Sequence, residues 1–176
     1  LKLNMEKSKV VCVYSQKFKF LGFTLGNNKT GVTIRVHKQS LKKAKAKLKE
    51  LTGRNQGRNV RVVMNKVKVY VSGWLNYYCI ASMKRKMQDW DEWLRRRFRQ
   101  YIWKQWKNPK TKRENLKKLG IPKERAEMWG NTRLGYWRVA GSPILSRAIT
   151  NEKLVKAGYY VLAVNYEFKR LKHYGI

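Results

Sequence analysis

Apolar residues recur every three or four positions through the middle of the chain, which places them on one face of an α-helix. The first such segment covers residues 40–51, with Ser40 in the N-cap position and Gly53 just past its end. A second apolar stripe covers residues 60–78, and a third covers residues 83–106 and stops before a proline. The pattern predicts three long amphipathic helices.

Part of the second segment is also compatible with a β-strand. Residues 66–71 alternate between apolar and polar side chains, as a half-buried strand does. Arg61, Asn65, Lys68 and Ser72 nevertheless fall together on the polar face of a helix. The helix is therefore the favoured interpretation.

The first 36 residues have a different period. Residues 10–14 and 18–25 are apolar runs, and residues 32–36 alternate, with Thr33 and Arg35 predicted to face outward. Turn-forming residues separate these runs. We predict short antiparallel strands, which are marginal unless they pack against another element.

The last third of the chain predicts shorter helices, at residues 112–119, 122–129, 143–149, 152–157 and 161–172. Ser142 and Asn151 are expected to act as N-caps for two of them. The predicted fold class is mainly α: an N-terminal antiparallel β-hairpin, then a basic helical bundle, then a C-terminal region of short helices.

The charge balance narrows the class of partner. The chain has 42 Lys and Arg against 10 Asp and Glu, a formal charge of +32. A compact body with this charge repels itself unless it meets a polyanion. No stretch approaches 18 uncharged apolar residues, and the basic residues are spread along the whole chain. We therefore expect a nucleic acid as partner and no membrane.

Residues that carry chemistry are few. The only aspartates, Asp89 and Asp91, diverge on a helix and are expected to complement its dipole instead of holding a pair of metal ions. His37 and His173 have no triad or metal-ligand spacing, and the cysteines are expected to be buried free thiols in a reducing, intracellular compartment. We expect no catalytic centre, metal site or cofactor in this chain.

Cations interleave with aromatic residues along the chain, a combination that neutralises phosphates and stacks on exposed bases. Trp90 and Phe98 belong to an apolar stripe and are predicted to be core, whereas Trp103, Trp106 and Trp137 are open to either packing or stacking. The lysines of the first helix could instead form an ordinary solvent-exposed face that binds nothing. The candidate nucleic-acid contacts are Lys42, Lys43, Lys45, Lys47, Lys49, Arg61, Lys68, Tyr77, Tyr78, Lys104, Trp106, Lys107, Trp137 and Arg138.

Three ordered motifs resemble one family. Residues 1–9 (LKLNMEKSK) followed by Phe20-Leu21-Gly22-Phe23 resemble the end of the palm of a group II intron reverse transcriptase/maturase. Residues 72–78 (SGWLNYY) resemble the "RGWxNYY" signature of its maturase-specific thumb, domain X, with Ser72 where the family usually has Arg. Residues 102–109 (IWKQWKNP) and 115–121 (NLKKLGI) are similar to the end of that domain and the start of the DNA-binding region.

The resemblance implies three parts. Residues 1–36 would be the end of the palm, in which Phe20, Leu21, Gly22 and Phe23 form a primer-grip-like hairpin. Residues 37–108 would be the thumb, and residues 109–176 a basic DNA-binding region. The family's Tyr-x-Asp-Asp metal site is not in this sequence, so Mg²⁺ and polymerase activity are expected in an upstream part of a longer parent.

The resemblance also implies partners. They would be group II intron RNA during splicing, and target DNA and RNA–DNA duplex during target-primed reverse transcription. The expected location is the bacterial cytoplasm, associated with the nucleoid or a ribonucleoprotein. The alternatives are a free-standing maturase-like RNA-binding protein and a structural protein of a ribosome-like particle, and the regular apolar stripes weigh against the latter.

Overall fold

The computed structural model describes residues 19–28 and 31–175, and these are mainly helical with one N-terminal hairpin, which confirms the predicted fold class. The strand predicted at residues 10–14, the thiol of Cys12 and the motif at residues 1–9 lie outside the described residues. The elements are β1 (Phe23–Asn28), β2 (Gly31–Val36), α1 (Lys38–Leu51), α2 (Val60–Tyr78), α3 (Lys84–Gln105), α4 (Pro109–Lys118), α5 (Lys123–Gly130), α6 (Tyr136–Ala140), α7 (Pro143–Ala148), α8 (Asn151–Lys156) and α9 (Leu162–Tyr174).

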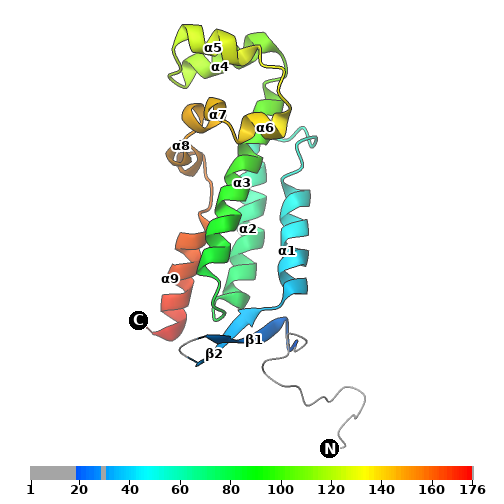
Figure 1. Cartoon of the computed structure of the whole chain (residues 1–176), viewed down its shortest axis with the longest axis vertical. Coiled ribbons are helices and arrows are strands. Elements are labelled where there is room, and N and C mark those ends of the chain that lie inside the picture. Colours follow the sequence, from blue (N-terminus) through cyan, green and yellow to red (C-terminus); the bar gives the residue numbers. More distant parts are fainter. Residues whose placement is uncertain (1–18, 29–30, 176) are drawn as a thin grey trace, which may run out of the picture.

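The three long helices lie side by side, with the hairpin across one end and α4 and α5 at the other (Figure 1). The alternative strand at residues 66–71 is wrong, because α2 runs through it without a break. Helix α3 spans 22 residues, or about 33 Å at 1.5 Å per residue. It contacts α2, α6 and α9 and is the centre of the structure.

The core follows the apolar stripes. Met64, Leu75, Met87, Leu94 and Phe98 are fully buried where α2 and α3 meet their neighbours. Each such side chain contributes about 1.5–3 kcal/mol of hydrophobic stabilisation. Cys79 is a free thiol and is buried, as predicted.

Several predicted helix starts are displaced by one to three residues. Helix α1 begins at Lys38, and its N-cap is His37, whose Nδ1 accepts from the N–H of Gln39 at 3.2 Å. Ser40, the predicted cap, instead donates its hydroxyl to the carbonyl of Gly22. Asn108 caps α4, which begins at Pro109, and Thr150 replaces Asn151 as the cap of α8. The short helix α6 was not predicted.

The Phe20–Phe23 segment is a tight turn rather than part of a strand. Phe20 and Phe23 exchange two backbone hydrogen bonds, of 3.1 and 2.8 Å, and the two residues between them have positive φ angles of 48° and 84°. Positive φ at both central residues is typical of a type I′ turn. The predicted strand at residues 18–25 is therefore wrong over residues 19–22, because the described strand begins at Phe23.

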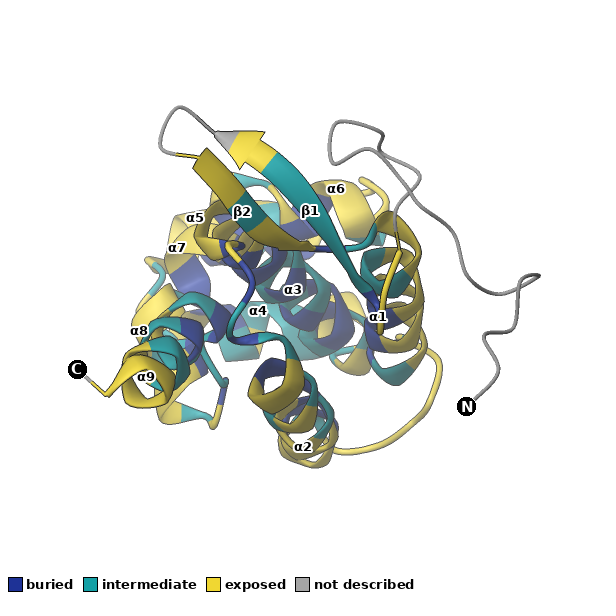
Figure 2. Ribbon diagram, turned by 90° about the horizontal axis from the view of Figure 1, so that it is seen from below, coloured by how far each residue is buried: buried dark blue, intermediate teal, exposed yellow. Residues whose placement is uncertain are grey.

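The hairpin contacts the bundle through the turn before β1 and through β2, where the N–H of Ser82 donates to the carbonyl of Ile34 at 2.8 Å. Val36 is buried, but Val32 is 63% exposed and Ile34 is 40% exposed. The alternation that places Thr33 and Arg35 outward would put these three side chains inward, but two of them are exposed, and β2 is mostly exposed in Figure 2. At the turn, the carbonyls of Leu21 and Gly22 accept hydrogen bonds from the Tyr77 hydroxyl and the N–H of His37, respectively.

Gly22→Ala is expected to lower the free energy of unfolding by about 1–2 kcal/mol, because a side chain disfavours positive φ. A Cβ at Gly22 would also overlap the Tyr78 hydroxyl, which adds to the cost. Gly31→Ala is the matched control, since its φ is also positive but no atom of the described residues lies within 4 Å of where an added Cβ would be. Urea unfolding compares the two, and an equal loss would show that the turn is not anchored to α2.

Asp91 joins α3 to the start of α9. Its Oδ1 accepts from the Tyr159 hydroxyl at 2.5 Å and from the N–H of Leu162 at 2.9 Å, and its Oδ2 accepts from the N–H of Ala163 at 2.9 Å. Burial and then the Asp91 charge raise the pKa of Tyr159, so its hydroxyl stays protonated and donates. The prediction that Asp91 complements the dipole of its own helix is wrong, because the carboxylate caps α9.

Asp91→Asn is expected to cost about 1.5–3 kcal/mol of stability, because an amide has one acceptor oxygen for three donors and carries no charge. Its neighbour Glu92 is exposed, so Glu92→Gln is the matched control and should change stability little. Thermal unfolding at fixed salt measures both. Equal melting temperatures for the two variants would contradict the capping role.

Candidate nucleic-acid interface

Helices α1, α3 and α6 enclose an open groove with a volume of about 540 Å³, here called the α1–α3 groove. One wall is a row of lysines on α1, and the other combines aromatic and basic side chains of α3 with a tryptophan of α6. The lining residues are Lys42, Lys45, Ala46, Lys49, Trp93, Arg97, Gln100 and Trp137.

The spacing of the lysines explains why they line this wall. Lys42, Lys45 and Lys49 are three and four residues apart, so they lie on one face of α1. Ala44 and Leu48 occupy the buried face. The sequence of α1 therefore holds its cations along one side of the groove by the same period that packs its core.

Two tryptophan rings in the groove hold cations. Lys45 and Arg97 both lie over Trp93, at 5.3 and 5.1 Å from the ring centroid. Arg96 lies over Trp137 at 4.1 Å and donates two hydrogen bonds to the carbonyl of that residue. Because cations at these distances are attracted to the ring face, the rings orient the charges.

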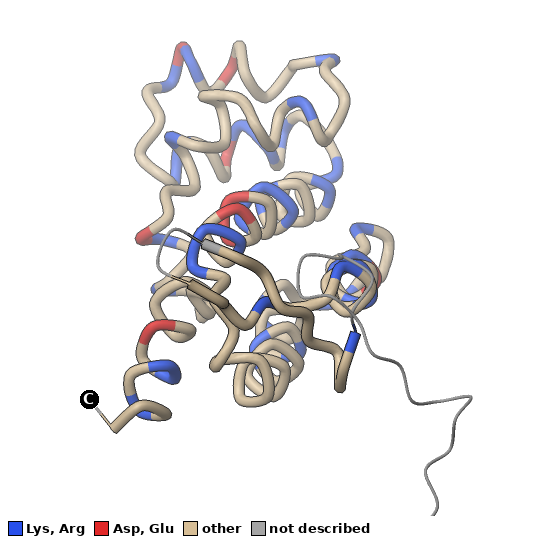
Figure 3. Tube along the Cα trace, turned by 60° about the horizontal axis from the view of Figure 1, so that its bottom comes forward, with Lys and Arg blue, Asp and Glu red and all other residues tan. Residues whose placement is uncertain are grey.

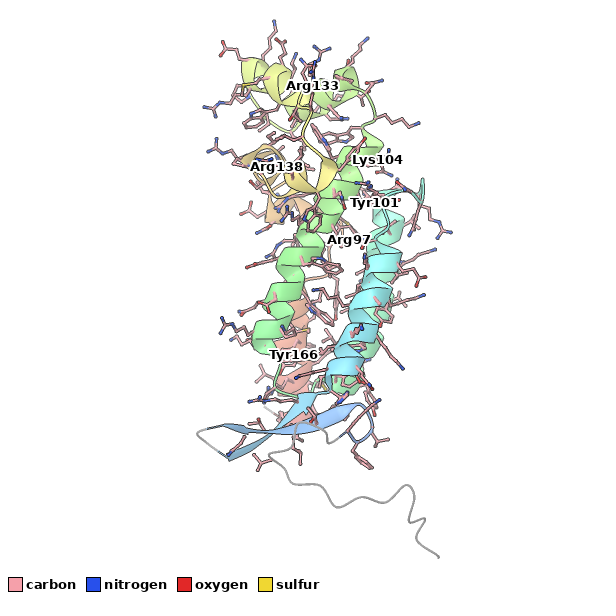
Figure 4. The ribbon with its side chains drawn as sticks, turned by 45° about the vertical axis from the view of Figure 1, so that its right-hand side comes forward. Arg97, Tyr101, Lys104, Arg133, Arg138 and Tyr166 are labelled. Atoms are coloured by element: carbon pink, nitrogen blue, oxygen red, sulfur yellow. The ribbon has the colours of Figure 1, made fainter. Side chains whose placement is uncertain are left out.

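Arg97 fixes the position of α1 against α3 (Figure 4). Its guanidinium donates to the Thr52 hydroxyl at 2.5 Å, the Thr52 carbonyl at 3.1 Å and the Lys49 carbonyl at 2.9 Å. These acceptors are at the C-terminal end of α1, where the helix dipole favours a cation. Burial lowers the pKa of Arg97, but an arginine stays charged at neutral pH.

The groove is positively charged without compensation. Within residues 19–28 and 31–175, the ion pairs are Lys47–Glu50, Lys84–Glu167, Lys86–Asp89 and Lys117–Glu127, and none includes a cation of the groove. Figure 3 shows Lys and Arg along each long helix and Asp and Glu in few places. The groove thus offers phosphates a row of cations that form no ion pair with a carboxylate of the described residues.

One comparison with known proteins bears directly on this surface. Residues 41–120 match the model of the group II intron, maturase-specific domain. The match supports a group II intron maturase region at these residues, hereafter the maturase region. Among curated proteins, no match to the chain is found.

The maturase region contains both long walls of the groove. Helix α3 and nearly all of α1 fall within it, whereas Trp137 of α6 lies beyond its end. The match also includes the SGWLNYY motif and extends past residue 108, where the resemblance placed the end of the thumb.

The five predicted lysines of α1 divide into two sets. Lys42, Lys45 and Lys49 line the groove. Lys43 faces an adjoining hollow with Gln39, and Lys47 is paired with Glu50 at 2.9 Å. We therefore expect the first three lysines to be the main contacts on this helix.

The aromatic pair of the SGWLNYY motif lies elsewhere, beneath the hairpin. Tyr77 stacks on Phe23 with a centroid separation of 5.4 Å, and Tyr78 packs between Phe23 and Trp74. These rings join the maturase region to the Phe20–Phe23 turn. Their contact with nucleic acid stays a prediction, as does that of the primer-grip-like turn.

The four tryptophans that the sequence assigned to packing or stacking fall into three environments. Trp90 and Trp103 are buried, and Trp106 is half-buried with its edge toward Trp103 at 5.6 Å. Trp137 is 39% exposed beside the groove. The open question for Trp103 is thus decided in favour of packing, and Phe98 is core as predicted.

The other predicted cations are outside the groove. Arg61 and Lys68 are exposed on α2, Lys107 follows α3, and Arg138 is exposed on α6 (Figure 4). Lys104 lies farther along α3 and approaches the Tyr136 ring. Their part in binding stays a prediction.

Sequence reasoning missed Trp93 and Arg97 as site residues. They are four apart on α3, which predicts a shared face, but nothing in the sequence says that this face meets the lysines of α1. In the described part of the chain, no group of three His, Cys, Asp or Glu is placed to hold a metal ion, and no helix is long and apolar enough to span a membrane.

Proposed function

We propose that this chain binds group II intron RNA through the α1–α3 groove and thereby assists splicing. The observation that carries the proposal is the uncompensated row of cations on the walls formed by the maturase region. The maturase-specific domain implies intron RNA as the partner. Structured RNA offers closely spaced phosphates at its surface, which suits such a row.

The mode of contact is expected to be phosphate binding more than base stacking. Both tryptophan rings of the groove already have a cation over a face. A base could stack on that ring face only by displacing the cation, whereas a phosphate could bind the cation where it lies. Intron selectivity would then come from RNA shape rather than from base reading.

The finer parts of the proposal rest on the resemblance. Residues 37–108 would act as the thumb of a reverse transcriptase and clamp a template–primer duplex, and residues 109–176 would contact target DNA. Residues 20–23 would support the primer end, which fits their place on an exposed hairpin at the end of the bundle. Mg²⁺ and the polymerase centre would belong to an upstream part of a bacterial reverse transcriptase in a nucleoid-associated or ribonucleoprotein complex.

Filter binding tests the proposed partner. The chain is titrated against a group II intron RNA and against an unrelated structured RNA of equal length at the same salt concentration. We expect tighter binding to the intron RNA, and equal affinity would contradict a maturase role. The chain alone should not extend a primer, so Mg²⁺-dependent extension would overturn the assignment of polymerase activity to a longer parent.

A further inference from the structure

A second group of cations surrounds the ring of Tyr136, and none of them lines the α1–α3 groove. The Arg54 guanidinium lies 5.0 Å from the ring centroid, the Lys104 amine 5.1 Å and the Lys112 amine 5.9 Å. They come from the loop after α1, from α3 and from α4, and the ring comes from α6. We call these four residues the Tyr136 cluster.

The cluster concentrates like charge. Because all three cations lie within 6 Å of one point, the distance between any two of them exceeds the Debye length, ~10 Å at 0.1 M salt, only slightly at most. Lys104 and Lys112 are both half-buried, so solvent screens them less than it screens a free surface lysine. Their mutual repulsion is therefore a cost in the unliganded protein.

No carboxylate in the described part of the chain forms an ion pair that would relieve this repulsion. None of the ion pairs within the described ranges includes Arg54, Lys104 or Lys112. By contrast, Lys117 of α4 forms an ion pair with the carboxylate of Glu127 on α5. The attraction of each cation to the Tyr136 ring, and of Lys112 to Trp103 at 4.7 Å, offsets only part of the cost.

We propose that the Tyr136 cluster is a phosphate-binding site, which takes one backbone phosphate of the bound RNA. The ring holds the three cations close to one another, and a phosphate that binds beside the ring reduces their repulsion and replaces lost solvation with charge-assisted hydrogen bonds. That the phosphate belongs to intron RNA rests on the proposed function. The affinity for phosphate itself rests only on the cluster.

The site also joins parts of the chain that are separate in sequence. The three cations lie within residues 41–120, but Tyr136 lies after the match ends. A phosphate held there contacts the bundle, the loop after α1 and α4 together. Occupancy therefore stabilises the packing of α4 against the bundle.

The first test compares two double variants of the full chain with the same change in charge. Lys104→Gln/Lys112→Gln removes two cations of the cluster, and Lys110→Gln/Lys118→Gln removes two exposed cations of α4 that do not contact the ring. With structured RNA, the cluster variant should bind roughly 5- to 8-fold more weakly at 0.1 M salt, and its log–log salt slope should fall by about 0.7–0.9. A similar loss in the control variant would overturn the proposal.

The second test uses inorganic phosphate without RNA. Sodium phosphate should raise the melting temperature of the wild-type chain above that in sodium chloride of equal ionic strength, and the cluster variant should lose this shift. Without phosphate, the cluster variant should melt at the same or a higher temperature than wild type, because repulsion is relieved. A lower melting temperature would show that the cluster is merely structural and would overturn the proposal.

The two proposals fail in different ways. If intron RNA and unrelated RNA bind equally, the maturase role is contradicted, but the phosphate-dependent shift in melting temperature stands. If the wild-type shift is absent or the cluster variant keeps it, the phosphate site is contradicted, whatever the preference for intron RNA. Tyr136→Phe should preserve the shift and Tyr136→Leu should weaken it, since only the former keeps the ring.

Discussion

Replacing Lys42, Lys45 and Lys49 together with Gln is expected to weaken binding to structured RNA by roughly 100- to 500-fold at 0.1 M salt, if each lysine contacts one phosphate. The three amines line one wall of the groove, and no carboxylate pairs with them in the described ranges. Each contact that is lost also lowers the log–log salt slope by about 0.7–0.9. Filter binding over a series of salt concentrations gives both quantities.

The stability of this variant separates binding from folding. Gln has nearly the helix propensity of Lys, and fewer positive charges reduce self-repulsion, so the melting temperature should be unchanged or higher. Lys66→Gln/Lys123→Gln/Lys156→Gln is the matched control, since it removes three exposed lysines from α2, α5 and α8. If the control binds RNA as weakly as the groove variant, net charge and not the groove determines affinity.

Trp90→Ala is expected to lower the free energy of unfolding by roughly 3–5 kcal/mol, as truncation of a buried aromatic side chain does. Trp90 is 4% exposed and lies against the Trp74 ring at a centroid separation of 5.5 Å. Small domains are stable by only about 5–15 kcal/mol, and this chain carries a net charge of +32. The variant should therefore be largely unfolded at low salt.

Trp137→Ala is the comparison for Trp90→Ala. Its ring is 39% exposed and borders the groove, so its loss should cost much less stability. It should instead weaken RNA binding, because Arg96 loses the ring that orients it. Urea unfolding at one fixed salt concentration decides the matter: equal losses of stability would mean that Trp137 is core and not part of an interface.

The periodic spacing of apolar residues predicts the long helices well, because helix formation depends mainly on residues that are close together in the sequence. The polar face marked by Arg61 and Lys68 decides between helix and strand in α2 without any knowledge of neighbours. Helix ends are less certain, since a cap residue can have another partner. Ser40 is an example: its hydroxyl bonds Gly22, 18 positions away, and His37 takes the cap.

Contacts between distant segments are not visible in the sequence. Asp91 is an acidic residue in the first half of α3, a position typical of residues that complement a helix dipole. Its hydrogen-bond partners nevertheless lie about 70 positions later, at and just before the start of α9. Val32 and Ile34 alternate like buried residues, and yet they are 63% and 40% exposed. Alternation shows that a strand has an apolar face, and only the packed structure shows what meets it.

One wall of the α1–α3 groove can be predicted from the sequence and the other cannot, because the second wall depends on contacts between distant segments. The lysine row of α1 comes from one short segment, so the sequence predicts it. The opposite wall forms only where Trp93 and Arg97 of α3 meet Trp137 of α6. The Tyr136 cluster depends on four segments between residues 54 and 136. Such convergence follows from helix packing, which no single segment specifies.

Lysine reactivity in the presence of intron RNA tests the central claim most directly. The full chain is acetylated with and without bound intron RNA, and the modified lysines are quantified by mass spectrometry. Binding through the α1–α3 groove predicts strong protection of Lys42, Lys45 and Lys49, with Lys66, Lys123 and Lys156 remaining reactive. Unchanged reactivity of the three groove lysines while the RNA is bound, or equal protection of all six, would contradict it.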